Sequence, residues 1–181
     1  MSAEYGLMGA YRGKSRMSRT IKFATCSKYS HVSHIEAKVL DGRMVGPLWE
    51  IESVGGMGVC KVQYPGYNHT PGTRVDLFRL KQPLTDEQHE KLVKGLHAEL
   101  GKKYDWWGII GFLLRAKIND PAEWFCSELL HAKYGYAGLW IQERIASSKV
   151  SPERMVNSPL WDPAGYMIVG EGMRVYASDQ I

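Results

Sequence analysis

Apolar and polar residues alternate along much of the first half of the chain, which is the pattern of half-buried β-strands. The alternating runs predict strands over residues 5–11, 29–39, 48–53, 59–63 and 75–80. Asp41-Gly42 separates two of these runs, a strong hairpin signal. The glycine-rich stretch 55–58 marks the next turn. The first half therefore predicts an antiparallel sheet of about five strands.

Apolar residues at helical spacing take over after the last of these runs. Thr85 and Gln88 have the spacing of a capping box, and a stripe of leucines follows it. Further helices are expected from Ser15 or Ser18 to about Thr25, over 105–114, after Cys126 and from Ser151, with a final strand at 166–169. Strands packed against helices in this order predict an α+β fold.

The composition fits one globular domain over residues 1–181. The chain is 44% hydrophobic and 23% charged, which is enough apolar material for a real core. The first ten residues lack the pattern of a signal peptide, and the longest apolar run, 106–114, is too short to cross a bilayer. Three cysteines without CxxC spacing argue against a disulfide framework or a structural zinc site. We therefore expect a cytoplasmic protein.

Positive charge is concentrated near the N-terminus, although the net charge is only +4. One stretch without an acidic residue carries Arg12, Lys14, Arg16, Arg19, Lys22 and Lys28. Such a stretch can attract nucleic acid, anionic lipid or an acidic polymer. It lacks the aromatic and glycine pattern of nucleic-acid modules, so we expect a solvated helix face and no specific nucleic-acid partner.

Cys126 is the candidate nucleophile, because Trp124-Phe125-Cys126-Ser127-Glu128 places a thiol where an apolar run gives way to a helix. The unpaired N–H groups and the dipole at a helix N-terminus favour a thiolate and can hold an oxyanion. A small buried core residue is the alternative reading.

A cysteine nucleophile needs a base, and position in the predicted elements leaves two of the six histidines. His31 and His34 both lie at the start of a strand, and their spacing puts them on opposite faces, so at most one can meet the thiol. The orienting group is expected on the paired strand, where Glu50 and Glu52 share a face. Glu52, just before the glycine turn, is the preferred residue.

The order of these motifs resembles the circularly permuted cysteine hydrolases of the NlpC/P60 superfamily, some of them phage and prophage proteins. The resemblance covers roughly residues 5–135 and rests on the order of these blocks: Ser33-His34-Ile35-Glu36, Asp41-Gly42, Ile51-Glu52-Ser53, Gly55-Gly56, Tyr104-Asp105-Trp106-Trp107-Gly108 and Trp124-Phe125-Cys126-Ser127-Glu128. It implies a papain-like fold in which the histidine strand precedes the cysteine helix, and virion association if the chain is phage-encoded.

Carried over residue by residue, the resemblance implies Cys126 as nucleophile, His34 as base and Glu52 as the third residue. It places Tyr104 in the cleft, and the start of the cysteine helix, with Ser127, at the oxyanion. A shifted alignment would make His31 the base, since it also follows a Tyr-Ser pair. Many relatives have a histidine where this chain has Glu52.

The function that follows is hydrolysis of a peptide or isopeptide amide, as in bacterial peptidoglycan, through an acyl-enzyme and without metal or cofactor. A lipid-directed acyltransferase or thioesterase would use the same triad, and the apolar run 106–114 would then line an acyl channel. A non-catalytic structural protein is a third reading. A metal site from Cys26, His31, His34 and Cys60 matches no common ligand spacing. The sequence is silent on the oligomeric state.

Overall fold

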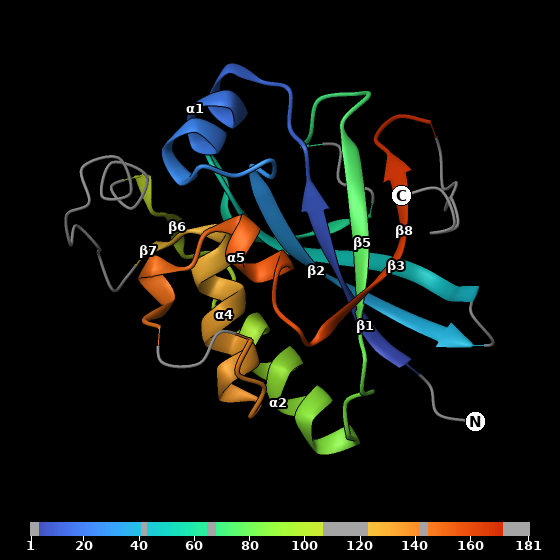
Figure 1. The fold of residues 1–181 in the computed structure, drawn as a ribbon. Helices are drawn as coiled ribbons and strands as arrows, with labels where there is room; N and C mark the ends of the chain where they lie inside the picture. The colour runs from blue at the N-terminus through green and yellow to red at the C-terminus, as the bar shows by residue number, and fades with distance from the viewer. Residues whose placement is uncertain (1–3, 41–42, 65–67, 107–122, 142–144, 172–181) are drawn as a thin grey trace.

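The computed structural model describes residues 4–40, 43–64, 68–106, 123–141 and 145–171, and Figure 1 shows their arrangement. Within these residues the chain forms a six-stranded sheet with helices packed on one face, so the α+β fold class is confirmed. The predicted Asp41-Gly42 turn and most of the predicted helix over 105–114 lie outside the described residues.

The sheet is antiparallel throughout, in the order β4-β3-β2-β1-β5-β8. Its strands are β1 (Glu4–Tyr11), β2 (His31–Leu40), β3 (Arg43–Val54), β4 (Gly58–Gln63), β5 (Arg74–Leu80) and β8 (Trp161–Ile168). Five strands were expected before the helices, and these are the first five. The sixth, β8, was expected only over 166–169, because Pro163 and Gly165 interrupt the strand pattern. As an edge strand, β8 can accommodate a proline, which lacks a ladder donor.

The helices begin where capping residues predict. In α1 (Arg16–Thr25) the Ser15 side chain accepts the N–H of Ser18, and α2 (Asp86–His97) opens with the predicted capping box at Thr85. α2 ends at His97, one turn earlier than its leucine stripe suggested. The remaining elements are α4 (Cys126–Tyr136), η1 (Ser147–Lys149), α5 (Pro152–Val156) and a parallel pair of short strands, β6 (Lys103–Tyr104) and β7 (Glu123–Trp124).

The main core lies between the sheet and the helices α2 and α4, where Val32 and Ile51 of the sheet meet Leu92, Leu96 and Leu129. A second apolar cluster includes Ile35, Leu48 and Leu77. Val32 and Ile35, three positions apart on β2, lie in different clusters, as the alternation of side chains along a strand requires. Among the described residues, no helix is both long and apolar enough to cross a membrane.

Candidate active site

Cys126 is the first residue of α4, as the sequence predicts, and its side chain is fully buried. Phe125 occupies the N-cap position in an extended conformation, and no side chain caps the helix. The segment before the thiol is held to the sheet, because Ser53 Oγ donates a hydrogen bond to the Trp124 carbonyl at 2.6 Å. The thiol is thus fixed at the positive end of the helix dipole.

His31, the first residue of β2, is the histidine that the fold brings to Cys126. Its ring lies beside the Cys126 side chain, and its Nε2 lies 2.7 Å from Glu52 Oε2. Burial opposes a charge on this ring, but the neighbouring Cys126 and Glu52 outweigh burial and raise the pKa of His31 to about 10. With Nε2 directed at Glu52, Nδ1 is the nitrogen left for the thiol.

Glu52 lies buried on β3 and accepts several hydrogen bonds. Burial raises its pKa, but the bonds from His31 and His69, the latter at 2.9 Å, hold that pKa well below the ordinary value. Asn68 Nδ2 donates to the second oxygen, Oε1, at 3.2 Å. Glu52 is therefore an ionised carboxylate that can orient the imidazole.

His34 does not lie where the resemblance placed it. In the β2–β3 register it is paired with Ile51, so it shares the face of Ile51 and not that of Glu52. It is fully buried, its Nδ1 is 3.0 Å from the Tyr134 hydroxyl, and burial lowers its pKa to about 4. His34 thus meets α4 at Tyr134, about two helical turns beyond Cys126, and lies on the opposite face of the sheet from Glu52. The expectation that His34 faces Cys126 is therefore wrong, and the shifted alignment, with His31, fits the structure.

Tyr104 lies near the thiol and Ser127 does not face a cleft. The parallel pairing of β6 with β7 sets Tyr104 beside Trp124, and burial together with the adjacent Cys126 raises the pKa of Tyr104, which keeps its hydroxyl protonated. Ser127 is fully buried and its Oγ donates to the Val150 carbonyl. Its side chain ties α4 to η1, so only its backbone N–H remains for an oxyanion.

Two supporting residues escaped the sequence analysis. His69 lies in the loop between β4 and β5 and Tyr11 at the end of β1, and neither was among the predicted site residues. The Tyr11 ring stacks on the His69 ring, with centroids 4.0 Å apart, and the Tyr11 hydroxyl donates to Glu50 Oε1. Burial and the neighbouring charge of Glu52 raise the pKa of Glu50 to about 7. No local pattern marks His69, because only the return of its loop over β3 brings it to Glu52.

One group of residues in the described part of the chain has the geometry of a metal site. His31, Glu52 and His69 each offer one ligand atom, and these atoms lie within 4.8 Å of one another. Two imidazoles and a carboxylate suit Zn²⁺ and similar ions. The metal set considered from the sequence is not assembled, since Cys26 is exposed at the end of α1 and His34 is bonded to Tyr134.

Comparison with known proteins adds a fold relative. No protein-family model and no curated protein matched the chain. A solved structure described as the metalloprotein YiiX of Escherichia coli O157:H7, DUF1105, matches at 20% identity with a TM-score of 0.65, over 90% of this chain and 97% of that one. At this identity the match concerns the fold: this chain has the α+β fold of YiiX.

Proposed function

We propose that this chain is a cysteine hydrolase of the permuted papain-like type, with Cys126 as nucleophile, His31 as base and Glu52 as orienting residue. The observation that carries the proposal is the unbroken chain of contacts from the thiol through the imidazole to an ionised carboxylate. Each member comes from a different element, namely α4, β2 and β3. This is the nucleophile, base and orienter arrangement of covalent catalysis.

The first half of the reaction forms a thioester. The Cys126 sulfur attacks the carbonyl carbon of the substrate while its proton resides on His31. The carbon–nitrogen bond then breaks, and the imidazolium gives its proton to the leaving amine. Backbone N–H groups at the start of α4 face the developing oxyanion, and the protonated Tyr104 hydroxyl is a further donor.

The second half returns the enzyme to its starting state. His31 removes a proton from water, the resulting hydroxide attacks the thioester carbon, and the carboxylic acid leaves as the thiol is regenerated. Glu52 remains ionised and keeps Nε2 of His31 protonated, so that Nδ1 carries the proton to and from the reaction. These steps use side chains and backbone N–H groups of this chain, and water.

The description of YiiX as a metalloprotein raises the question of a metal here. The donor set His31, Glu52 and His69 fits one, and these three residues would hold it. A bound Zn²⁺ supplies Lewis acidity and a positive charge. The hydrolytic cycle above needs neither, because His31 and Glu52 act in it through protons.

Trapping the acyl-enzyme tests the proposal. Cross-linked peptidoglycan stem peptides, the substrate class that the resemblance implies, are incubated with the protein and with Cys126→Ser. We expect new amine and carboxylate ends with wild type, none with the variant, and a thioester adduct on Cys126 by mass spectrometry. Amide cleavage that persists in Cys126→Ser would contradict the nucleophile. The substrate class alone would be contradicted if other amides are cleaved and these are not.

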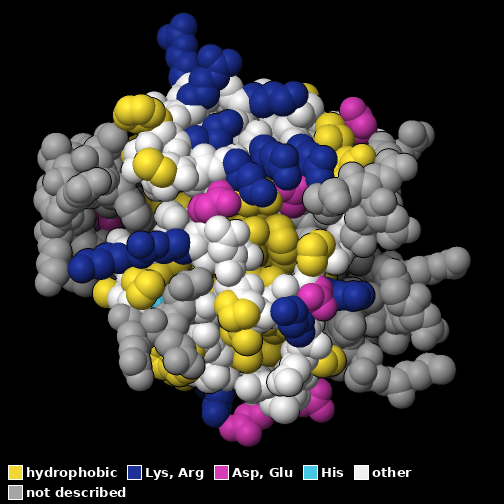
Figure 2. Space-filling model, viewed as in Figure 1, with side chains coloured by type: hydrophobic (Ala, Val, Ile, Leu, Met, Phe, Trp, Pro, Cys, Tyr) yellow, Lys and Arg dark blue, Asp and Glu magenta, His cyan; other side chains and the backbone are white. Residues whose placement is uncertain are grey.

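A second candidate, transfer or hydrolysis of a lipid-derived acyl group, is favoured by one observation on α1. Phe23 is 80% exposed and Met17 is 44% exposed, and both stand among basic side chains. Figure 2 shows Lys and Arg gathered over this end of the molecule. An exposed apolar and basic helix suits an anionic membrane surface. A long-chain acyl thioester that labels Cys126, where stem peptides do not, would favour this candidate.

A further inference from the structure

His31 and Glu52 belong at once to the proposed catalytic triad and to the metal-capable group. His31 Nε2 and Glu52 Oε2 are 2.7 Å apart, and His69 Nε2 lies 2.9 Å from the same oxygen. All three side chains are largely shielded, with side-chain exposures of 10%, 0% and 12% for His31, Glu52 and His69. Two imidazole nitrogens and one carboxylate oxygen, shielded from solvent, are a common ligand set for zinc.

Small movements of the three side chains would bring their ligand atoms to the distances found around a tetrahedral metal ion. Ligand atoms around Zn²⁺, at about 2.0–2.2 Å from the ion, stand about 3.4 Å from one another. The His31–Glu52 distance of 2.7 Å would therefore open by about 0.7 Å and the His69–Glu52 distance of 2.9 Å by about 0.5 Å. Tyr11 holds the His69 ring by stacking, and Asn68 holds the other Glu52 oxygen, so the outer partners that orient ligands are also present.

We propose that His31, His69 and Glu52 bind a divalent transition metal such as Zn²⁺, and that this binding silences Cys126. The silencing clause rests on the proposed function; the metal site does not. The ion takes the Nε2 lone pair of His31 and displaces the proton shared with Glu52. The ring then keeps its remaining proton on Nδ1 and cannot accept one from the thiol or from water. The metal-bound form and the base form of His31 exclude each other.

His69 allows metal binding to be tested apart from catalysis, because it is a ligand of the proposed metal but touches no reacting atom in the hydrolytic cycle. The chain also supplies a matched control. His97 Nε2 lies 2.9 Å from Glu36 Oε1, the same distance as between His69 and Glu52, but the amine of Lys61 lies 3.4 Å from that nitrogen. One imidazole beside a carboxylate and an ammonium does not make a chelate.

The test measures metal binding directly. Chelator-treated protein is titrated with Zn²⁺ against a chromophoric chelator, and Co²⁺ is added separately to record its visible absorption. We expect one tight site in the wild type, a loss of more than about tenfold in affinity for His69→Gln and for His31→Gln, and no change for His97→Gln. Cys126→Ser should bind as the wild type does, since the thiol is not a ligand.

Unchanged Zn²⁺ affinity in His69→Gln would overturn the site, and so would an equal loss of affinity in His97→Gln. Loss of binding in Cys126→Ser would also overturn it, because the sulfur would then be a ligand. Silencing is read by iodoacetamide labelling of Cys126, which Zn²⁺ should suppress in the wild type but not, at the same concentration, in His69→Gln. If the wild type binds Zn²⁺ and its labelling is unaffected, the silencing clause is wrong while the site stands. If the protein hydrolyses amides through Cys126 but binds no Zn²⁺, the metal site is refuted while the proposed hydrolase function stands.

Discussion

At the scale of single residues, the two histidines of β2 have opposite electrostatic settings. His31 is buried, but the neighbouring Cys126 and Glu52 outweigh burial and raise its pKa to about 10. His34 is buried against Tyr134, and its pKa is lowered to about 4. One histidine is therefore charged at neutral pH and the other is not, although only three positions separate them.

The first prediction compares these residues through Cys126. In a Cys26→Ser background the remaining thiols are Cys126 and Cys60, and burial with the nearby glutamates raises the pKa of Cys60 to about 12, so Cys60 stays protonated. Iodoacetamide labelling at pH 6.5 then reports on Cys126. We expect His31→Ala to slow labelling at least about tenfold, because the imidazolium that stabilises the thiolate is lost. His34→Ala, if folded, should change it less than about threefold; the reverse order would restore His34 as the base.

The second prediction concerns acid stability. The pKa of His34 falls from 6.5 to about 4 on folding, so the unfolded chain binds the proton first as the pH drops. The contribution of neutral His34 is therefore complete above about pH 6.5 and is lost between there and pH 4, a change of about 3 kcal/mol. His34→Asn keeps a polar atom near Tyr134 but does not titrate. In urea unfolding at several pH values, the free energy of unfolding should fall less steeply below pH 6.5 for this variant than for the wild type. An equal fall in both proteins would disprove a neutral, buried His34.

At the scale of elements, the turn between β3 and β4 is pressed against the segment that leads to β6. Gly58 has φ +75°, and a Cβ there would lie 2.1 Å from the Lys102 carbonyl oxygen. Gly56 has φ +90° and open space around it. Val59 N–H donates to the same Lys102 oxygen at 2.8 Å, which explains the close approach.

These two glycines make a matched pair for a third prediction. Gly56→Ala should lower the free energy of unfolding by about 1–2 kcal/mol, the cost of a left-handed alanine. Gly58→Ala adds a backbone clash to that cost and should lower it by at least about 2 kcal/mol more. Chemical denaturation of both variants measures the difference. Equal losses would mean that β4 and residue Lys102 are not in contact in solution.

The fourth prediction distinguishes anchoring from catalysis at the start of α4. Ser127→Ala removes the donor to the Val150 carbonyl, and an unsatisfied buried acceptor costs about 1–3 kcal/mol. Since the Ser127 side chain points away from the thiol, labelling of Cys126 should change less than about threefold. A thermal unfolding curve and the labelling rate, measured on one preparation, test both parts. Slow labelling of Cys126 with unchanged stability would mean that the Ser127 side chain faces the active site and does not anchor α4.

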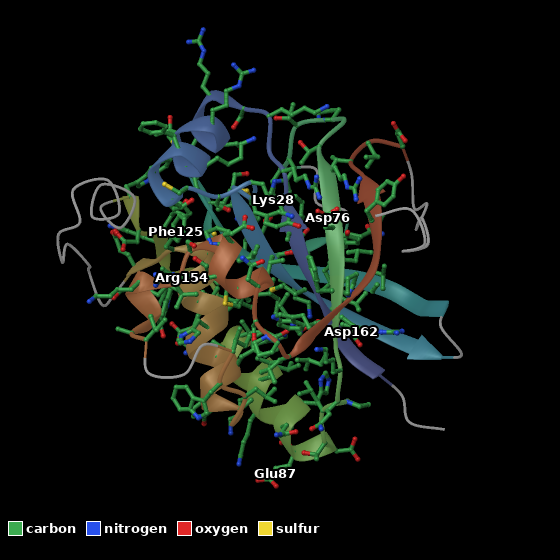
Figure 3. All side chains as sticks on the ribbon, in the orientation of Figure 1. Lys28, Asp76, Glu87, Phe125, Arg154 and Asp162 are labelled. Atoms are coloured by element: carbon green, nitrogen blue, oxygen red, sulfur yellow. The ribbon has the colours of Figure 1, made fainter. Side chains whose placement is uncertain are left out.

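At the scale of the whole molecule, the basic residues on and next to α1 lie at the same end as the start of α4. Figure 3 places Phe125, the N-cap of α4, in the half of the molecule nearer to α1, and Glu87 of α2 at the far end. Arg12 and Arg74 are paired with Asp76, but within the described residues no ion pair engages Lys14, Arg16, Arg19, Lys22 or Lys28. Among the described residues, this end therefore carries a group of neighbouring cations that no ion pair neutralises.

The fifth prediction follows from that uneven charge. The protein should cosediment with vesicles that contain anionic phosphatidylglycerol, bind neutral vesicles weakly, and dissociate at about 0.5 M salt. Arg19→Ala with Phe23→Ala should reduce binding at least about tenfold. Lys94→Ala with Trp140→Ala is the control, since it removes one exposed cation and one exposed aromatic residue elsewhere. Equal reductions in both double variants would exclude α1 as the contact.

The sequence alone determined what short-range physics controls. Alternation places the strands of the first half, since side chains of a strand face opposite sides at every step. Side-chain oxygens at Ser15 and Thr85 begin their helices, as the local pattern indicates. The position of Cys126 at the start of α4 is likewise a local property, because it depends on where an apolar run meets a helix-forming one.

Only the tertiary structure decided which groups meet. The spacing of His31 and His34 indicates only that they face opposite sides of the sheet. The register of β2 with β3 decides that His34 shares the face of Ile51 and that His31 meets Glu52. His69 reaches Glu52 from a loop, and β8 joins the sheet only as the partner of β5. A shift of one residue in strand pairing moves every side chain of the strand to the other face of the sheet. Where a loop places its residues likewise depends on the rest of the fold. Such contacts depend on the whole chain, so no local pattern contains them.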